Sequence, residues 1–128
     1  MIHATITDAS YRTAFTSNTS TAVADLPQSK GGAGEGFGPH DLLEAALATC
    51  LTITARMFAV KCGWTLSKVE CDVRIDRTDP DAVAFDYVLG LGSDLTPVQE
   101  QELRAAVARC PVARTLTGRI SIRSSFEI

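Results

Sequence analysis

The longest apolar pattern in the chain runs from Pro39 to about Val60 and predicts an α-helix. Residues of one mainly apolar face recur there at spacings of three and four, which is the helical period. That face consists of Leu43, Leu47, Cys50, Thr54 and Met57, widened by Leu42, Ala46, Ile53 and Phe58. Pro39 suits the first helical position and Gly63 can cap the far end. Because most of the circumference is apolar, we expect this helix to be central and buried.

Loose alternation of β-branched and polar residues before this helix predicts two or three short strands within residues 2–26. The run QSKGGAGEGFG follows and is rich in glycine. Such a run gives up too much backbone entropy on ordering to form a strand or a helix. The run matches neither of the phosphate-binding motifs GxxxxGK[ST] and GxGxxG. We therefore expect it to be a flexible connector.

Two alternating segments after the helix predict a pair of antiparallel strands, within residues 66–76 and 83–91. The inner positions of the first segment are Val69, Cys71, Val73 and Ile75, and those of the second are Val83, Phe85, Tyr87, Leu89 and Leu91. The turn residues RTDPDA lie between them.

A capping box at Thr96–Gln99, with Pro97 at the first helical position, predicts a second helix. Its inner face is Leu103, Ala106, Val107 and Cys110. A proline at 111 disfavours helical backbone at Cys110, so we expect a break there and a short further turn. Isoleucine and phenylalanine then recur to the end of the chain and predict a final strand through Ile120, Ile122, Phe126 and Ile128.

The resulting order, βββ-α-ββ-α-β, predicts an α+β fold with a mostly antiparallel sheet wrapped on the first helix. A chain of 128 residues leaves room for one domain, spanning 1–128. The first helix carries more apolar surface than one sheet of this size covers. We therefore expect a homodimer whose interface buries the remainder.

Charge and composition argue against nucleic-acid binding and membrane association. A net charge of −3 lacks the basic footprint that nucleic acid or an anionic membrane surface requires. Asp41, Glu44 and Arg56 argue against a membrane span by the first helix, since a charge at the bilayer centre costs about 2.5–3.5 kcal/mol. The N-terminal residues lack the pattern of a signal peptide, so we expect a cytoplasmic protein with reduced cysteines.

The four cysteines stand at positions 50, 62, 71 and 110, without a CxxC pair, and only two histidines accompany them, so we expect no metal site. Cys50 and Cys110 each fall on the inward face of a helix. They are either packing residues or a thiol pair gathered in one apolar pocket. A thiol pair could reduce a peroxide, because a thiolate attacks the peroxide oxygen and a second thiol resolves the sulfenic acid as a disulfide. We interpret Cys62 and Cys71 as packing residues.

An attacking thiol needs a neighbouring cation or helix N-terminus to lower its pKa. Cys50 lies in mid-helix, so we expect a cation from another segment. Arg12 and Arg114 are candidates, and His40 is a candidate acid, base or donor. Arg56 lies about 240° round the helix from Cys50 and is expected to contact another element or a partner chain.

The run GGAGEGFGPHDLLEAALATCLTITARMFA, with CPVARTL following the first cysteine by sixty residues, resembles the osmotically inducible protein C (OsmC-like) family, which includes the organic hydroperoxide resistance proteins. The resemblance implies an α+β fold in which two chains intertwine, with active sites at the dimer interface. It also implies a cysteine peroxidase for organic hydroperoxides, with Cys50 as the attacking residue and Cys110 as the resolving one. Such enzymes carry no metal or flavin and are re-reduced by a dithiol, often of the dihydrolipoyl kind.

Two positions depart from the hydroperoxide resistance branch. That branch has a glutamate ten residues before the first cysteine, paired with an N-terminal arginine, whereas this chain has His40 at that position. The matching N-terminal segment contains no arginine, and Arg12 is the nearest substitute. The chain therefore resembles the general OsmC-like branch more closely.

Three hypotheses follow from the sequence. The first is a cytoplasmic homodimeric thiol peroxidase in which Cys50 attacks, Cys110 resolves, and Arg12 or Arg114 supports the thiolate. The second is a redox-sensing or small-ligand-binding dimer that uses the same pocket without turnover. The third is a structural dimer in which both cysteines only pack.

Overall fold

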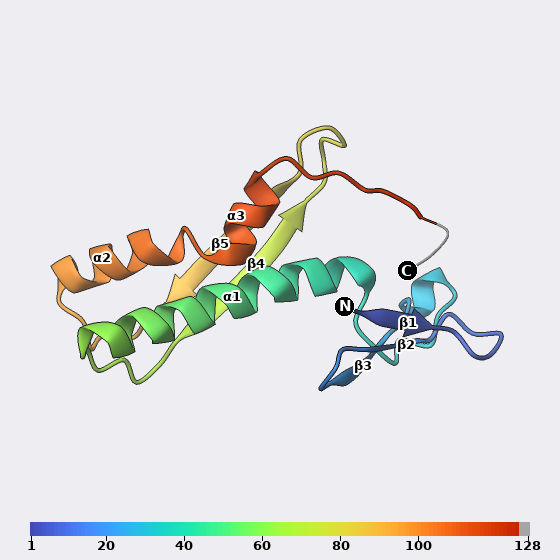
Figure 1. Cartoon of the computed structure of the whole chain (residues 1–128), viewed down its shortest axis with the longest axis horizontal. Coiled ribbons are helices and arrows are strands. Elements are labelled where there is room, and N and C mark those ends of the chain that lie inside the picture. The colour runs from blue at the N-terminus through green and yellow to red at the C-terminus, as the bar shows by residue number, and fades with distance from the viewer. Residues whose placement is uncertain (126–128) are drawn as a thin grey trace. The chain divides into compact units, whose positions relative to one another are not determined.

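The computed structural model describes residues 1–125, and its elements follow the order β1-β2-β3-η1-α1-β4-β5-α2-α3 (Figure 1). By its internal contacts the chain divides into two compact units, Met1–Glu44 and Ala45–Ile128, which we call the N-terminal and C-terminal units. Helix α1 (Pro39–Cys62) begins in the first and continues into the second. The expected single domain over 1–128 stays a prediction. The α+β class is confirmed.

The N-terminal unit is built on an antiparallel meander of three short strands, in the order β1-β2-β3. They are β1 (His3–Thr5), β2 (Thr13–Thr16) and β3 (Thr21–Ala24). The 3-10 helix η1 (Gln28–Lys30) lies in the glycine-rich run. The expected strands are therefore confirmed.

Asp25 organises the glycine-rich run, which is an ordered loop and not the flexible connector that the composition predicts. The buried carboxylate of Asp25 accepts hydrogen bonds from three backbone N–H groups. The N···O distances are 2.7 Å for Leu26, 3.1 Å for Glu35 and 3.3 Å for Ala33. These hydrogen bonds, the bond from the Glu35 amide above all, lower the pKa of Asp25. Gly32 passes so close to Leu26 that a Cβ there would lie 1.9 Å from its carbonyl oxygen.

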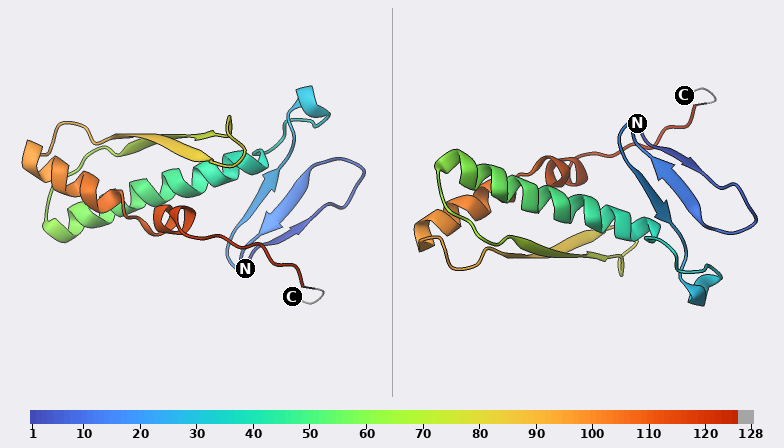
Figure 2. Two further views of the ribbon diagram at one scale, coloured as in Figure 1. Left: turned by 90° about the horizontal axis from the view of Figure 1, so that it is seen from above. Right: turned by 90° about the horizontal axis from the view of Figure 1, so that it is seen from below.

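The C-terminal unit has two layers, the hairpin of β4 (Glu70–Asp76) and β5 (Ala84–Gly90) and the helices that cover one of its faces (Figure 2). Those helices are α1, α2 (Pro97–Val107) and α3 (Pro111–Thr117). The predicted capping box of α2 is present, with Thr96 Oγ1 accepting the Gln99 N–H at 3.2 Å and Gln99 accepting the Thr96 N–H at 3.0 Å. The core between the layers comprises Leu47, Leu51, Ala55, Ala59, Leu66, Leu89, Leu91, Leu103, Val107 and Cys110.

Helix α1 starts at the predicted proline and ends at Cys62, with Gly63 in the left-handed conformation at φ 69°. Within the single chain only one stripe of α1 is buried, formed by Leu47, Leu51, Ala55 and Ala59. The hairpin and the other helices cover one side of α1 only, and burial of the other side in a homodimer stays a prediction. By length and composition α1 could also cross a membrane, with a mean hydropathy of 1.5.

Two further strand expectations need correction. The strands form two separate sheets, β1-β2-β3 and β4-β5, instead of one. No strand forms in residues 119–125, where Ile120 and Ile122 are exposed. A strand exists only through pairing, and no strand of the described chain pairs with this segment. Phe126 and Ile128 lie outside the described residues.

Candidate active site

Cys50 lies in the middle of α1, at the border between its buried stripe and its exposed side. The next residue, Leu51, is fully buried, whereas Cys50 is half-buried and packs against the edge of the core. Its position follows from the helical period, since a residue beside the centre of a buried stripe lies at the margin of that stripe. Cys50 is thus anchored in a rigid helix with part of its surface open.

Cys110 lies in the joint between α2 and α3. Pro111 at the first position of α3 requires extended backbone at the preceding residue, and Cys110 has φ −58° and ψ 153°. Cys110 is therefore the N-cap of α3, and its Sγ accepts the N–H of Ala113 at 3.4 Å. The residue is 1% exposed and belongs to the core itself. The predicted break and short further helix are confirmed.

The fold brings these two thiols, sixty residues apart in sequence, close enough for Cys50 to act on the pKa of Cys110. Burial raises the pKa of the Cys110 thiol, and the neighbouring Cys50 acts in the same direction. The N–H groups of Ala113 and Val112 oppose this by lowering the pKa, and the net shift is upward. The raised pKa means that Cys110 keeps its proton over a wider pH range than an ordinary thiol.

The candidate cations take different places. Arg114 lies one turn after Cys110 in α3, where its backbone N–H donates to the Cys110 carbonyl at 3.0 Å. Its exposed guanidinium has no hydrogen bond or ion pair to any residue in the described part of the chain. Arg12 belongs to the N-terminal unit, where its Nε lies 3.3 Å from Glu35 Oε2. His40 is an exposed residue in the first turn of α1, about three turns before Cys50.

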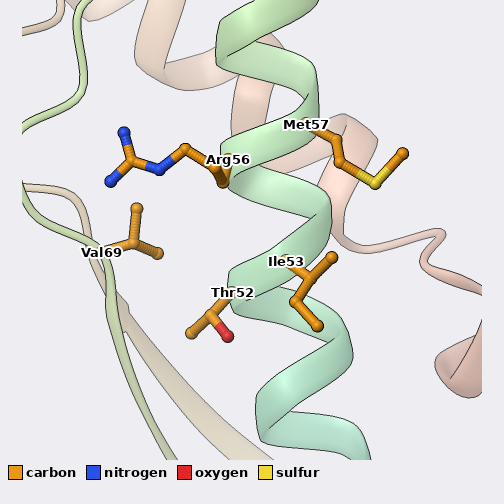
Figure 3. Close-up of a pocket in the computed structure, with 5 residues that line it drawn as sticks. All are labelled: Thr52, Ile53, Arg56, Met57 and Val69. Carbon is orange, nitrogen blue, oxygen red and sulfur yellow. The ribbon is translucent and has the colours of Figure 1, made fainter.

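Arg56 makes the contact with another element that its position predicts, since its Nη1 donates to the carbonyl of Leu66. It also lines a pocket of about 310 Å³ together with Thr52, Ile53, Met57 and Val69. Figure 3 shows Arg56 and Thr52 directed toward Val69, whereas Ile53 and Met57 extend to the other side of the helix. The pocket is thus lined by α1 and by Val69, the residue before β4.

The predicted packing role of Cys71 is confirmed, although the sequence did not show that it packs against the core that holds Cys110. This residue lies on β4 opposite Leu89, half-buried, and packs against the core that contains Cys110. Burial raises the pKa of the Cys71 thiol, and the charges of Asp72 and Cys110 add to the shift. Its inward place in the alternation was the available signal. Cys62 is exposed at the end of α1.

Among residues 1–125, no group of three His, Cys, Asp or Glu side chains is placed to hold a metal ion. The site joins a buried thiol, Cys110, to a more open one, Cys50.

Solved structures with the same architecture include an OsmC-like protein from Mycoplasma pneumoniae, with a TM-score of 0.78 at 25% identity over 92% of this chain and 86% of that protein. An organic hydroperoxide resistance protein of Bacillus subtilis gives 0.65 at 19% identity, over 92% of this chain and 90% of that one. An OsmC-like protein of unknown function from Vibrio cholerae gives 0.68 at 12% identity, over 91% and 92% of the two chains. No curated protein matches the chain.

The family model described as OsmC-like protein matches residues 32–125, which include α1, both helices that follow it and the β4-β5 hairpin. This span contains both thiols of the candidate site. The chain therefore belongs to the OsmC-like protein family.

Proposed function

We propose that this protein is a homodimeric thiol peroxidase that reduces organic hydroperoxides in the cytoplasm and is re-reduced by a dithiol. The observation that carries the proposal is the proximity of a half-buried Cys50 to a buried Cys110 on a separate helix. Membership of a family that includes hydroperoxide resistance proteins supports it.

The difference in burial supports Cys50 as the attacking residue and Cys110 as the resolving one. Cys110 is 1% exposed within its own chain, so a hydroperoxide can reach only Cys50 without unfolding the joint between α2 and α3. The thiolate of Cys50 attacks the terminal oxygen of the hydroperoxide and becomes a sulfenic acid. The O–O bond breaks, and the alkoxide leaves as an alcohol after taking a proton.

The second step closes a disulfide. The sulfur of Cys110 attacks the sulfenic sulfur of Cys50, and the hydroxyl leaves as water with the thiol proton of Cys110. A dithiol such as a dihydrolipoyl group then reduces the disulfide to two thiols and is itself oxidised to a cyclic disulfide. None of these steps requires a metal or a flavin. We propose Arg114 or Arg12 as the support of the Cys50 thiolate, with His40 as a further candidate.

The homodimer is proposed on the open side of α1. Ala46, Cys50, Ile53, Met57 and Val60 recur there at spacings of four and three, the pattern of a helix-packing seam. Ile53 is 58% exposed, Met57 67% and Val60 70%. A second copy would bury this seam and complete the walls around Cys50, since the seam passes through it.

The catalytic proposal is tested by consumption of cumene hydroperoxide in the presence of a dithiol. We expect steady turnover by the wild type, none by Cys50→Ser, and in Cys110→Ser a sulfenic acid on Cys50 that advances to sulfinic acid. Peptide mass spectrometry of the wild type should show a Cys50–Cys110 disulfide. A disulfide that forms without turnover would indicate the sensor instead. Two thiols that stay reduced would reject both and leave the structural dimer.

The dimer is tested with Met57→Glu, which places a charge in the seam, against Lys61→Glu as the matched change at an exposed polar site of α1. Light scattering should give a dimer for the wild type and for Lys61→Glu, and a monomer or aggregate for Met57→Glu. A monomeric wild type, or one that is recovered only with detergent, would contradict the proposal.

A further inference from the structure

Among residues 1–125, Cys71 is the half-buried cysteine for which the proposed reaction has no role. In strand β4 the residues 71, 73 and 75 alternate inward, whereas Glu70, Asp72 and Arg74 are exposed. Cys71 thus faces the helices, on the same side of the hairpin as Cys110.

One hydrogen bond ties α2 to this part of the hairpin. Cys71 pairs across the sheet with Leu89, which is buried. The carbonyl oxygen of Leu89 accepts a hydrogen bond of 3.0 Å from Nη1 of Arg104. This bond ties α2 to the hairpin beside Cys71. The chain continues from α2 through the buried Val107 to Cys110. Cys50 and Cys71 both pack against the core cluster of which Cys110 is a member.

We propose that Cys71 is a third redox-active residue, which takes over the disulfide from Cys50 by exchange at the sulfur of Cys110. The proposal rests on the proposed peroxidase function and extends it. The Cys71 thiol now donates to the carbonyl of Asp72 at 3.8 Å, a long bond that a rotation about the Cα–Cβ bond releases. Cys110 already lies close to Cys50, so the Cys50–Cys110 disulfide forms first.

The exchange balances without any further oxidant or reductant. The Cys71 sulfur, after losing its proton, bonds to the Cys110 sulfur; the Cys50–Cys110 bond breaks and Cys50 leaves as a thiolate. The proton lost by Cys71 passes to solvent or to Cys50. The products are a Cys71–Cys110 disulfide and a free Cys50, which can attack a second hydroperoxide before any dithiol arrives. Three thiols therefore hold two oxidising equivalents where two thiols hold one.

A direct test uses Cys50→Ser, which has no peroxide-attacking thiol, and the thiol oxidant diamide. We expect diamide to link Cys71 to Cys110 within one chain, as shown by peptide mapping after acid quenching and alkylation. Recovery of both residues alkylated as free thiols would overturn the proposal, because a pair that cannot be bridged cannot exchange. The same experiment in Cys50→Ser/Cys62→Ser removes the exposed cysteine, which could otherwise link separate chains.

A second test counts hydroperoxide consumed without a dithiol. The wild type should consume about two equivalents per chain, and Cys71→Val about one, since valine suits an inward strand position but cannot exchange. Cys62→Val is the matched control and should behave as the wild type. Equal consumption by the wild type and Cys71→Val would overturn the proposal. If hydroperoxide leaves Cys50 untouched while diamide still links Cys71 to Cys110, the peroxidase function fails and the third thiol stands.

Discussion

The N-terminal and C-terminal units are held together by different kinds of interaction. Among the described residues, all ten of the core belong to the C-terminal unit. Full burial of a large aliphatic side chain contributes about 1.5–3 kcal/mol to stability. In Met1–Glu44 the buried residue is Asp25, a charged one, and the three strands have exposed or half-buried side chains throughout. Apolar packing therefore positions the thiols, whereas backbone pairing and one carboxylate hold the N-terminal unit.

The largest effect should come from cutting into the apolar core. Leu103→Ala removes a fully buried side chain of α2 and should lower the free energy of unfolding by about 2–5 kcal/mol. Val88→Ala, at an exposed position of β5, should change it by less than about 0.5 kcal/mol. Urea denaturation measures both. Equal losses would mean that packing in this core is not what stabilises the C-terminal unit.

A smaller effect is expected where a polar contact supports that packing. Thr96→Ala removes the side-chain oxygen that caps α2 and should cost about 0.5–2 kcal/mol. Thr96→Ser keeps the hydroxyl and is the matched control. Urea denaturation measures the free energy of unfolding of both variants. If Thr96→Ala lost as much as Leu103→Ala, hydrogen bonding would stabilise the C-terminal unit as strongly as apolar burial does.

The smallest change in global stability should come from Asp25→Asn, which should loosen only the glycine-rich loop. Amide hydrogen exchange should become faster at Ala33 and Glu35, whose N–H groups bind the carboxylate, and stay unchanged in α2. Faster exchange throughout the molecule would break the comparison, since the carboxylate would then stabilise both units.

The same carboxylate gives this loop a pH dependence with a definite sign. The pKa of Asp25 is lowered in the folded protein, so its stabilisation is present above the unfolded pKa of about 3.9 and is lost as the pH falls through the lower folded value. Exchange at Ala33 and Glu35 in the wild type should therefore approach that of Asp25→Asn only in acid.

Local signals in the sequence were enough to place the helices. Pro39 and the Thr96–Gln99 capping box define the starts of α1 and α2, because the side chain or ring that starts each helix acts on its own first turn. Pro111 defines the joint at Cys110 for the same reason. The strand pair β4-β5 was predicted by alternation, although its strands are shorter than the alternating segments.

Contacts between residues far apart in the chain could not be predicted from the sequence. Alternation in residues 120–128 predicted a strand, but a strand also needs a neighbour to pair with, and alternation does not identify one. The apolar circumference of α1 did not show which side the chain itself covers. The inward faces of Cys50 and Cys110 indicated that the thiols could meet, whereas the near-complete burial of Cys110 depends on Leu103, Val107 and the whole core.

The polar contacts were the hardest to anticipate. Asp25 precedes a glycine-rich run, but only the folded loop shows that its carboxylate binds amides eight and ten residues away. Arg12 was considered as support for a thiolate, and its ion pair with Glu35 depends on the same loop. Cys71 was interpreted as a packing residue because alternation reports the face of a strand and not what lies opposite.

The bond from the Ala113 amide to the Cys110 sulfur makes a backbone group a reporter of the chemical state of the site. Conversion of that sulfur from thiol to disulfide changes the acceptor that the amide proton senses. A single resonance in a ¹⁵N-labelled sample should therefore follow each oxidation and reduction in real time, without a chromophore or an added tag.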